Sequence, residues 1–285
     1  MQPLDPRDLA LEAFAVARPT ALITLDLEPD YGGRCQAGLD RLGDLLHHMR
    51  ALGAPLTAFV EGRLFETRPE LCRALVDAGA EVQLHCYDHT QPGDTPATLA
   101  QGAAAYTACM AVAPEGYRAN GFRLTRELYA ALLDNGFGWD SSILPGIGLG
   151  ANPAPAFRRG DYFRLDGHLI EFPVATWRGL PLPFTHAYRR LIRPAAEAAL
   201  HRFCALPRLV VYDMHMVDLV RTGSLAGSPL PAYLKGLYRL SWRAGESDSF
   251  ASLTDAVEFL RARGYALTTA GALYRAIAHV AAPAA

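Results

Sequence analysis

The sequence has little of what would place a protein in a membrane, in a disulfide-rich class or on nucleic acid. No apolar run approaches the length of a transmembrane helix, and no basic segment followed by an apolar one begins the chain. The five cysteines are scattered, odd in number and form no C-x-x-C pair, which indicates reduced thiols. The formal net charge of −2 gives no reason to expect a nucleic-acid partner. We therefore expect a cytoplasmic protein.

What the sequence does have is a regular alternation of apolar, strand-like runs with helix-like segments. A chain of 285 residues, half of them apolar, is long enough for one large domain. The alternation, repeated about seven times, predicts a parallel, barrel-like α/β fold. We expect an N-terminal extension over residues 1–19, a single barrel domain over 20–275 and a flexible tail over 276–285.

Individual segments follow from periodicity and from Pro and Gly breaks. Strands are expected at 20–26, 55–60, 80–84, 169–174, 209–214 and 265–269. Helices are expected at 7–17, 39–52, 69–78, 95–112, 125–135, 186–205 and 252–263. Residues 144–168 are rich in Pro and Gly and are expected to be mostly loop.

Two histidines, His85 and His89, stand four residues apart just past one predicted strand. If the loop curls back, both imidazoles can reach one metal ion, and imidazole nitrogen suits zinc. Taken alone, the pair has a plainer interpretation, with His85 a satisfied core histidine and His89 a surface residue. The neighbours of the pair decide between the two.

Other polar residues also follow predicted strands. Asp26, Arg118 and His215 each stand at or just after the C-terminal end of an apolar run, as the two histidines do. In parallel α/β barrels the active site lies at this end of the strands. The sequence therefore predicts that these five side chains meet at one rim.

Six short motifs follow one another in the order seen in one family. They are Thr24-Leu25-Asp26 with Glu28 and Asp30, the pair His85 and His89, the loop Tyr117 to Phe122, Trp139 to Ile143, Glu171 to Val174, and Leu209 to His215. On these residues the chain resembles the polysaccharide deacetylase family, which includes the family-4 carbohydrate esterases. The resemblance implies a distorted (β/α)7-type barrel and removal of an N-acyl group from a sugar. The Tyr87-Asp88-His89 sequence resembles the corresponding motif in the branch of the family that acts on N-acylated or N-formylated biosynthetic aminosugars.

The chain departs from the family pattern after Asp26, where Leu27 replaces the usual second aspartate. Glu28 or Asp30 must then supply the third metal ligand. Strand alternation would point Asp26 and Glu28 the same way, whereas the chain turns beyond Pro29 and can bring Asp30 back. We expect Asp30 to be the ligand and Glu28 to contact the substrate.

The resemblance assigns roles to the other residues. A divalent ion, expected to be zinc, would activate water and polarise the amide carbonyl. Asp26 would act as general base, Arg118 would hold Asp26 ionised, and His215 would protonate the departing amine. The backbone amide of Tyr117 is a candidate oxyanion donor, and Trp177 is a candidate for lining a sugar pocket.

Two other function classes remain open on the sequence alone. Some relatives without the usual metal site hydrolyse cyclic amides, and a chain that lost its metal would be a non-catalytic binding protein. The stretch 184–205 carries Arg189, Arg190, Arg193 and Arg202 among apolar residues. It is either an ordinary amphipathic helix or a peripheral membrane contact near a lipid-linked sugar substrate.

Overall fold

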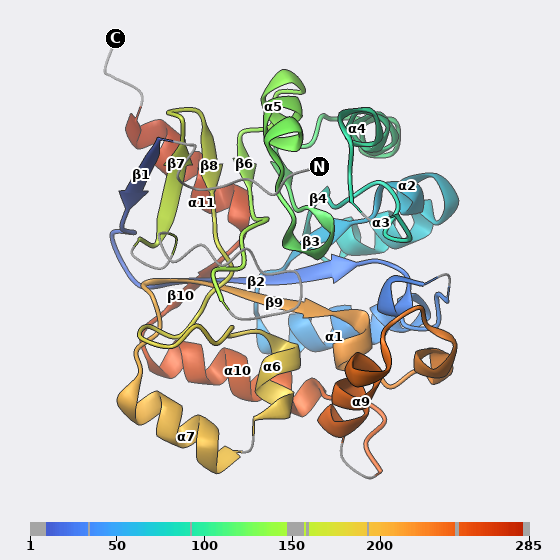
Figure 1. Ribbon diagram of the computed structural model, residues 1–285, viewed down its shortest axis with the longest axis vertical. Coiled ribbons are helices and arrows are strands. Elements are labelled where there is room, and N and C mark those ends of the chain that lie inside the picture. The colour runs from blue at the N-terminus through green and yellow to red at the C-terminus, as the bar shows by residue number, and fades with distance from the viewer. Residues whose placement is uncertain are drawn as a thin grey trace.

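The two longest described strands, β2 (Thr20–Leu27) and β9 (Leu209–His215), run side by side through the middle of the molecule (Figure 1). The computed structural model describes residues 10–33, 35–91, 93–146, 157, 160–192, 194–242 and 245–281. All eight residues of β2 are buried, because the strand is covered on both faces. β9 pairs with it in parallel over its full length, with Asp26 opposite His215.

The other strands extend this sheet on the far side of β2. β3 (Thr57–Val60) pairs with the C-terminal half of β2, and β10 (Ala266–Thr268) pairs with its N-terminal half. The sheet continues in parallel through β4 (Glu81–Leu84), β5 (Gly116–Tyr117), β6 (Trp139–Asp140) and β8 (Leu169–Glu171). It ends on two antiparallel strands, β7 (Tyr162–Leu165) and β1 (Leu11–Phe14).

A single backbone contact brings the sheet back to its starting point. The Ala175 N–H, just past β8, donates to the Val211 carbonyl of β9 at 3.0 Å. Strands β2, β3, β4, β5, β6, β8 and β9 thus curl into a distorted seven-stranded barrel in one domain. This confirms the expected α/β fold class.

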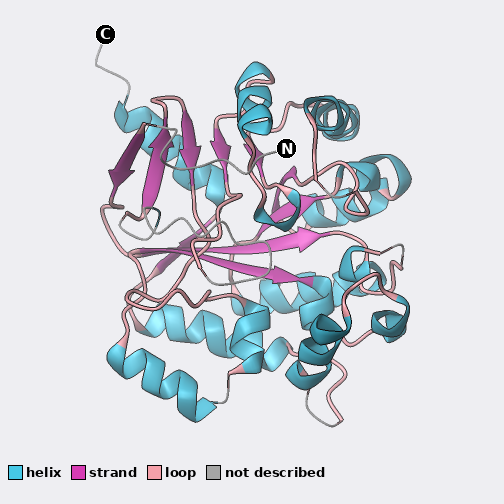
Figure 2. Cartoon of the chain, in the orientation of Figure 1, coloured by secondary structure: helices cyan, strands magenta, loops and turns pink. Residues whose placement is uncertain are grey.

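Helices pack outside the curled sheet (Figures 1 and 2). They are α1 (Leu42–Leu52), α2 (Gly62–Thr67), α3 (Pro69–Asp77), α4 (Pro96–Met110), α5 (Arg126–Asp134), α6 (His186–Leu191), α7 (Pro194–Phe203), α8 (Met216–Leu219), α9 (Ala232–Ser241), α10 (Phe250–Ala262) and α11 (Ala270–Ala281). Local sequence sets several ends. Thr95 caps α4 in a capping box with Thr98, and Gly53 ends α1 at φ 55°. Among the described helices, none has the length and apolarity that crossing a bilayer requires.

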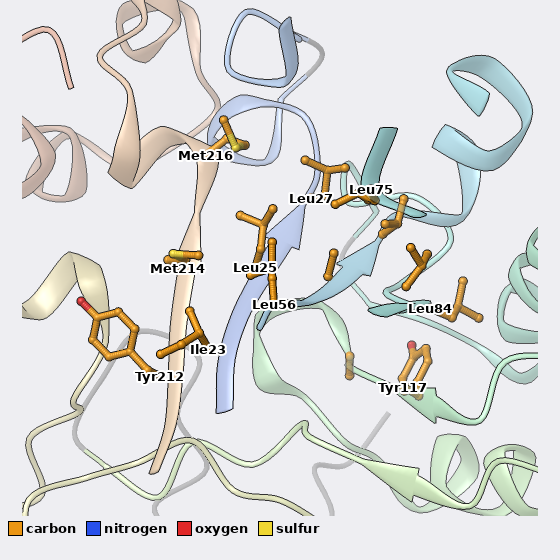
Figure 3. Close-up of a cluster of buried hydrophobic side chains, with 14 of the residues drawn as sticks. Ile23, Leu25, Leu27, Leu56, Leu75, Leu84, Tyr117, Tyr212, Met214 and Met216 are labelled. Atoms are coloured by element: carbon orange, nitrogen blue, oxygen red, sulfur yellow. The ribbon is translucent and has the colours of Figure 1, made fainter. Parts of the chain in front are cut away.

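Strand alternation divides the buried side chains into two layers. Ile23, Leu25 and Leu27 of β2 belong to the core between sheet and helices, and Figure 3 shows them beside Met214 and Met216. The residues between them point into the barrel. Below the polar end of the strands, the interior of the barrel is apolar, and Leu22, Phe59, Trp139 and Val211 form one cluster there. On the same face of β2, Thr24 and Asp26 follow Leu22 toward the C-terminal end of the strand. The barrel interior is therefore polar at the C-terminal ends of the strands.

Several local expectations were wrong. Residues 11–14, expected within a helix, form the edge strand β1, because pairing with β7 overrides a weak helical pattern. β7 itself lies in the segment expected to be mostly loop. Helix α11 continues through the start of the expected flexible tail to residue 281, and 282–285 lie outside the described residues. The short helix α2 and helix α9 were not foreseen.

The predicted helix over 186–205 is two helices, α6 and α7, and α7 begins at Pro194, whose missing N–H suits a helix start. Two of its arginines face inward. Arg189 bonds Glu197 at 2.5 Å, and Arg190 donates to the Asp218 carbonyl at 2.8 Å. Arg193 lies outside the described residues. These two arginines therefore do not form a basic membrane-facing stripe.

Two buried carboxyl groups face each other across β6 and β8, where Asp140 and Glu171 are register partners. Neither side chain is exposed, and Asp140 Oδ2 and Glu171 Oε2 receive no hydrogen bond from the rest of the described chain. Burial raises the pKa of Asp140, and burial together with Asp140 raises the pKa of Glu171 well above its usual value. We therefore expect the two groups to hold one proton between them, which would join the Trp139–Ile143 and Glu171–Val174 motifs.

Replacing Glu171 by Gln should supply a permanent donor to Asp140. A carboxyl whose pKa is raised on folding stabilises the protein below about pH 4, its pKa in the unfolded chain, and this contribution is lost as the pH rises through the folded value. Between pH 5 and pH 8, the free energy of unfolding should fall less in Glu171→Gln than in wild type, by on the order of 1–3 kcal/mol. Urea unfolding measures this, with exposed Glu258→Gln on α10 as the control. Equal losses in wild type and Glu171→Gln would contradict a shared proton.

Candidate active site

The structure brings the five predicted rim residues together at the C-terminal ends of the barrel strands. Asp26 is the second-to-last residue of β2, His215 is the last residue of β9, and these two residues are register partners. His215 Nε2 lies 3.7 Å from Asp26 Oδ2 and 3.8 Å from Glu28 Oε1. His85 and His89 approach the Glu28 carboxylate from the loop after β4.

Glu28 lies between the two histidines. Its Oε2 is 3.1 Å from His85 Nε2 and 2.7 Å from His89 Nε2. The three ligand atoms lie within 4.8 Å of one another. Burial alone would raise the pKa of Glu28, but the histidines outweigh it and hold that pKa well below its usual value. The carboxylate is therefore ionised and its charge is concentrated between two imidazoles.

These three residues fit a divalent cation by the chemistry of their donor atoms. His85 Nδ1 is 2.7 Å from the Arg118 carbonyl, which can only accept, so Nδ1 carries a proton and Nε2 is the nitrogen that would bind a metal. Two imidazoles and one glutamate are a known ligand set for catalytic zinc. His89 presents its Nε2 to the same point.

Asp30 does not belong to this group, which corrects our preference for it as the third ligand. Its Oδ1 accepts the Gly38 N–H at 2.9 Å, and its Oδ2 accepts the Ser224 hydroxyl at 2.7 Å. Both oxygens are thereby used to tie two loops together. β2 stays extended through Leu27, so alternation places Glu28 on the same face as Asp26.

Arg118 is fully buried and holds Asp26 in place. Its Nη1 lies 2.7 Å from Asp26 Oδ1 and 2.7 Å from Asp213 Oδ1. Its Nε donates to the Ser141 carbonyl, and the guanidinium stacks on Phe59 at 4.1 Å. A guanidinium without acceptors would be very costly here, so the two carboxylates compensate its charge.

His215 is oriented by a carboxylate that sequence reasoning missed. Asp218 Oδ2 lies 3.3 Å from His215 Nδ1 and also accepts the His215 backbone N–H at 3.1 Å. Burial would lower the pKa of His215, but Asp213, Asp218 and Glu28 outweigh it and raise that pKa well above its usual value. These carboxylates favour the protonated ring, whose Nε2 faces Asp26 and Glu28.

Asp213 and Glu61 were also missed. Asp213 sits opposite Thr24 in the β2–β9 pairing, inside the barrel, and Glu61 follows β3 directly. Glu61 Oε1 accepts the His89 N–H at 2.7 Å and so fixes the histidine loop. The sequence could have indicated both residues, because each is an acidic residue in or just after an apolar strand. Asp213 also stands two residues before His215.

Two expected substrate contacts are not supported by side-chain positions. Tyr117 is fully buried and its hydroxyl donates to Asp94 Oδ2 at 2.5 Å, so its side chain points away from the site. The proposed oxyanion role of its backbone amide stays a prediction. Trp177 is 1 % exposed and packs edge-on against Phe184 in the core. It is therefore a packing residue.

The match to a known family lies in the part of the chain that carries most of this site. Residues 16–124 match the sequence profile of the family described as polysaccharide deacetylase. This part of the chain is similar to the polysaccharide deacetylase family. It includes Asp26, Glu28, His85, His89 and Arg118, whereas His215 lies beyond it. None of the curated proteins matches the sequence.

Solved structures in and around the polysaccharide deacetylase family share the fold at low sequence identity. A CE4 family pseudoenzyme from Bacillus anthracis is 13% identical with a TM-score of 0.53, over 90% of this chain and 66% of that one. This chain thus spans about two thirds of the pseudoenzyme's length. A peptidoglycan N-acetylglucosamine deacetylase is 12% identical with a TM-score of 0.53, over 92% and 91%. An allantoinase is 14% identical with a TM-score of 0.55, over 94% and 93%. At these identities the likeness shows the fold alone.

The assignment of the third ligand can be tested by metal content. Glu28→Gln should lose bound zinc almost entirely, because an amide oxygen is a far weaker ligand than a carboxylate between two imidazoles. Asp30→Asn should keep it, since Asn can still accept the Gly38 N–H. Zinc per protein chain, measured by elemental analysis after dialysis, gives the answer. Loss in Asp30→Asn with retention in Glu28→Gln would restore the original assignment.

Proposed function

We propose that this chain is a metal-dependent hydrolase that removes an N-acyl group, acetyl or formyl, from an aminosugar or a sugar-containing biosynthetic intermediate. The observation that carries the proposal is the group Glu28, His85 and His89 next to the Arg118–Asp26 pair and His215. The match of residues 16–124 to a deacetylase family supports hydrolysis as the reaction class. The acyl group, the sugar and the cytoplasmic location remain predictions.

Glu28, His85 and His89 would hold a divalent cation, for which zinc is the best match to two imidazoles and a carboxylate. Such an ion, when bound, lowers the pKa of water and polarises the amide carbonyl. Glu28 directly follows β2, and both histidines lie in the loop after β4. Glu61 fixes the second of these by its bond to the His89 N–H.

Asp26 would take the proton of the attacking water. Arg118 binds its Oδ1, which leaves Oδ2 turned toward the space shared with His215 Nε2. The same guanidinium keeps the carboxylate ionised and prevents it from rotating. A base held in this way needs no reorganisation when the water arrives.

His215 would give its Nε2 proton to the departing nitrogen. An amide nitrogen leaves poorly as an anion, so the C–N bond breaks as that proton is transferred and the sugar leaves as a free amine. Asp218 holds Nδ1 and thereby points Nε2 at the reacting centre. Asp26 then releases the proton taken from water, and the acyl group leaves as a carboxylate.

The substrate class is tested by comparing three amides with one enzyme preparation. Protein purified without added metal should contain about one zinc per chain and should hydrolyse N-acetylglucosamine or N-formylglucosamine glycosides, with no turnover of a cyclic imide. Released amine is measured with a primary-amine reagent. Turnover of the cyclic imide alone would favour the activity class suggested by the allantoinase fold relative, and absence of zinc and of all turnover would favour a non-catalytic binding protein.

The roles of base and acid can be separated with two variants. Asp26→Asn should lose on the order of 10²–10⁴ in kcat on every substrate, the usual worth of a general base. His215→Ala should lose a similar factor on amides but little on an activated aryl ester, whose leaving group needs no proton. Circular dichroism checks that both variants are folded. If His215→Ala slows ester and amide equally, His215 only positions other groups.

A further inference from the structure

A cavity of about 180 Å³ opens directly beside His215. Asp213, His215 and Asp218 form its polar end. Its remaining walls come from α6, α9 and the turn after β5, and they are mostly apolar. Among the lining residues are Phe122, Leu144, Ala187, Tyr188, Leu234 and Tyr238.

The size of this cavity exceeds what a small acyl group needs. An apolar cavity of about 150 Å³ holds benzene, so the space beside His215 can accept an apolar group of about six carbons. An acetyl methyl or a formyl hydrogen would leave most of it empty. Apart from the charged residues at the His215 end, the only polar groups on the described walls are the hydroxyls of Thr185, Tyr188, Tyr238 and Ser241, so most of the lining is apolar.

The apolar surface continues outward from the cavity along α9. Leu237 lines the cavity and is 40% exposed, and Leu240, one turn further along the same helix face, is 78% exposed. Leu191 of α6, also at the cavity wall, is 38% exposed. Large exposed leucines next to an opening are costly unless something apolar covers them.

We propose that the amide substrate carries an apolar chain of six or more carbons, which enters the cavity beside His215 and continues over Leu237 and Leu240. This inference rests on the proposed amide hydrolysis, since it places the chain relative to His215. The chain can be attached on either side of the scissile bond, as a longer acyl group or as an alkyl group on the sugar. The two attachments are separated by experiment.

Two ligand series probe the cavity. One varies the acyl group of an N-acylglucosamine from acetyl to hexanoyl and decanoyl, and the other varies the alkyl glycoside of N-acetylglucosamine from methyl to hexyl and decyl. The readouts are kcat/KM in wild type and Kd by calorimetry in Asp26→Asn, in which turnover is expected to be slower by on the order of 10²–10⁴. In one series, Kd should fall about threefold to fourfold per added methylene, on the order of 100-fold in total, and then level off near six to eight carbons.

Two variants test whether the gain comes from this cavity. Ala187→Phe should fill it, and Leu237→Asp should place a charge at its mouth. Each substitution, added to Asp26→Asn, should abolish the dependence of Kd on chain length. The Kd of the shortest ligand should stay within about twofold of its value in Asp26→Asn alone. Matched controls are Ala251→Phe on the exposed face of α10 and Val112→Asp beyond α4, because both positions are exposed and outside the cavity.

The outcomes distinguish the cavity from the reaction. A chain-length dependence that Ala187→Phe and Leu237→Asp remove, in either series, supports the proposal and identifies the side of attachment. Flat series together with hydrolysis of the acetyl compound overturn the apolar chain and leave the deacylase intact. Chain-dependent binding without hydrolysis of any amide overturns the proposed function and leaves the apolar subsite standing. A dependence that survives both variants places the chain elsewhere and overturns the assignment to this cavity.

Discussion

The Arg118 guanidinium, enclosed between Asp26 and Asp213 inside the barrel, is the interaction on which the rest of the site depends. It links β2 to β9 through the two carboxylates and reaches the segment after β6 through Ser141. Its own carbonyl accepts the His85 Nδ1 proton and so selects the tautomer of a proposed metal ligand. Because leaving a buried charge unpaired costs about 3–5 kcal/mol, each of these partners is held in its place by the others. Arg118 therefore positions the proposed base, one proposed histidine ligand and three parts of the sheet.

The barrel interior has two layers. A charged layer lies at the C-terminal ends of the strands, and an apolar layer, the floor, lies beneath it. Leu22, Phe59, Trp139 and Val211 fill the floor, and Arg118 rests on the Phe59 ring at the boundary. The floor excludes water from below, which strengthens the charge interactions above it. The largely apolar cavity beside His215 lies at the side of these charges. The polar groups at the rim are thus exposed to solvent from few directions, although they carry several charges.

The fold and the centre of the site could be predicted because both follow from short-range patterns. Alternating strands and helices imply a parallel barrel, and residues at strand ends then meet at one rim whatever their distance in sequence. The choice between Glu28 and Asp30 failed because it depends on where β2 stops being extended, and on loop partners as distant as Ser224. Asp213 and Asp218 were missed because acidic residues flanking a histidine have no distinctive spacing. Residues 11–14 form a strand only because β7 is available to pair with them, and Trp177 is distinguished from a pocket residue only by three-dimensional packing.

The proposed base and one proposed metal ligand, Asp26 and Glu28, are carried by β2 and the residue just after it. Their backbone positions are separated by two residues of extended chain, a distance of about 6.6 Å that covalent geometry keeps nearly constant. β2 is also buried along its whole length and paired on both sides, so its backbone opens to solvent only when the whole barrel does. We therefore expect the backbone amides of this strand to exchange slowly, and heat to inactivate the protein by global unfolding before any local loosening of this strand.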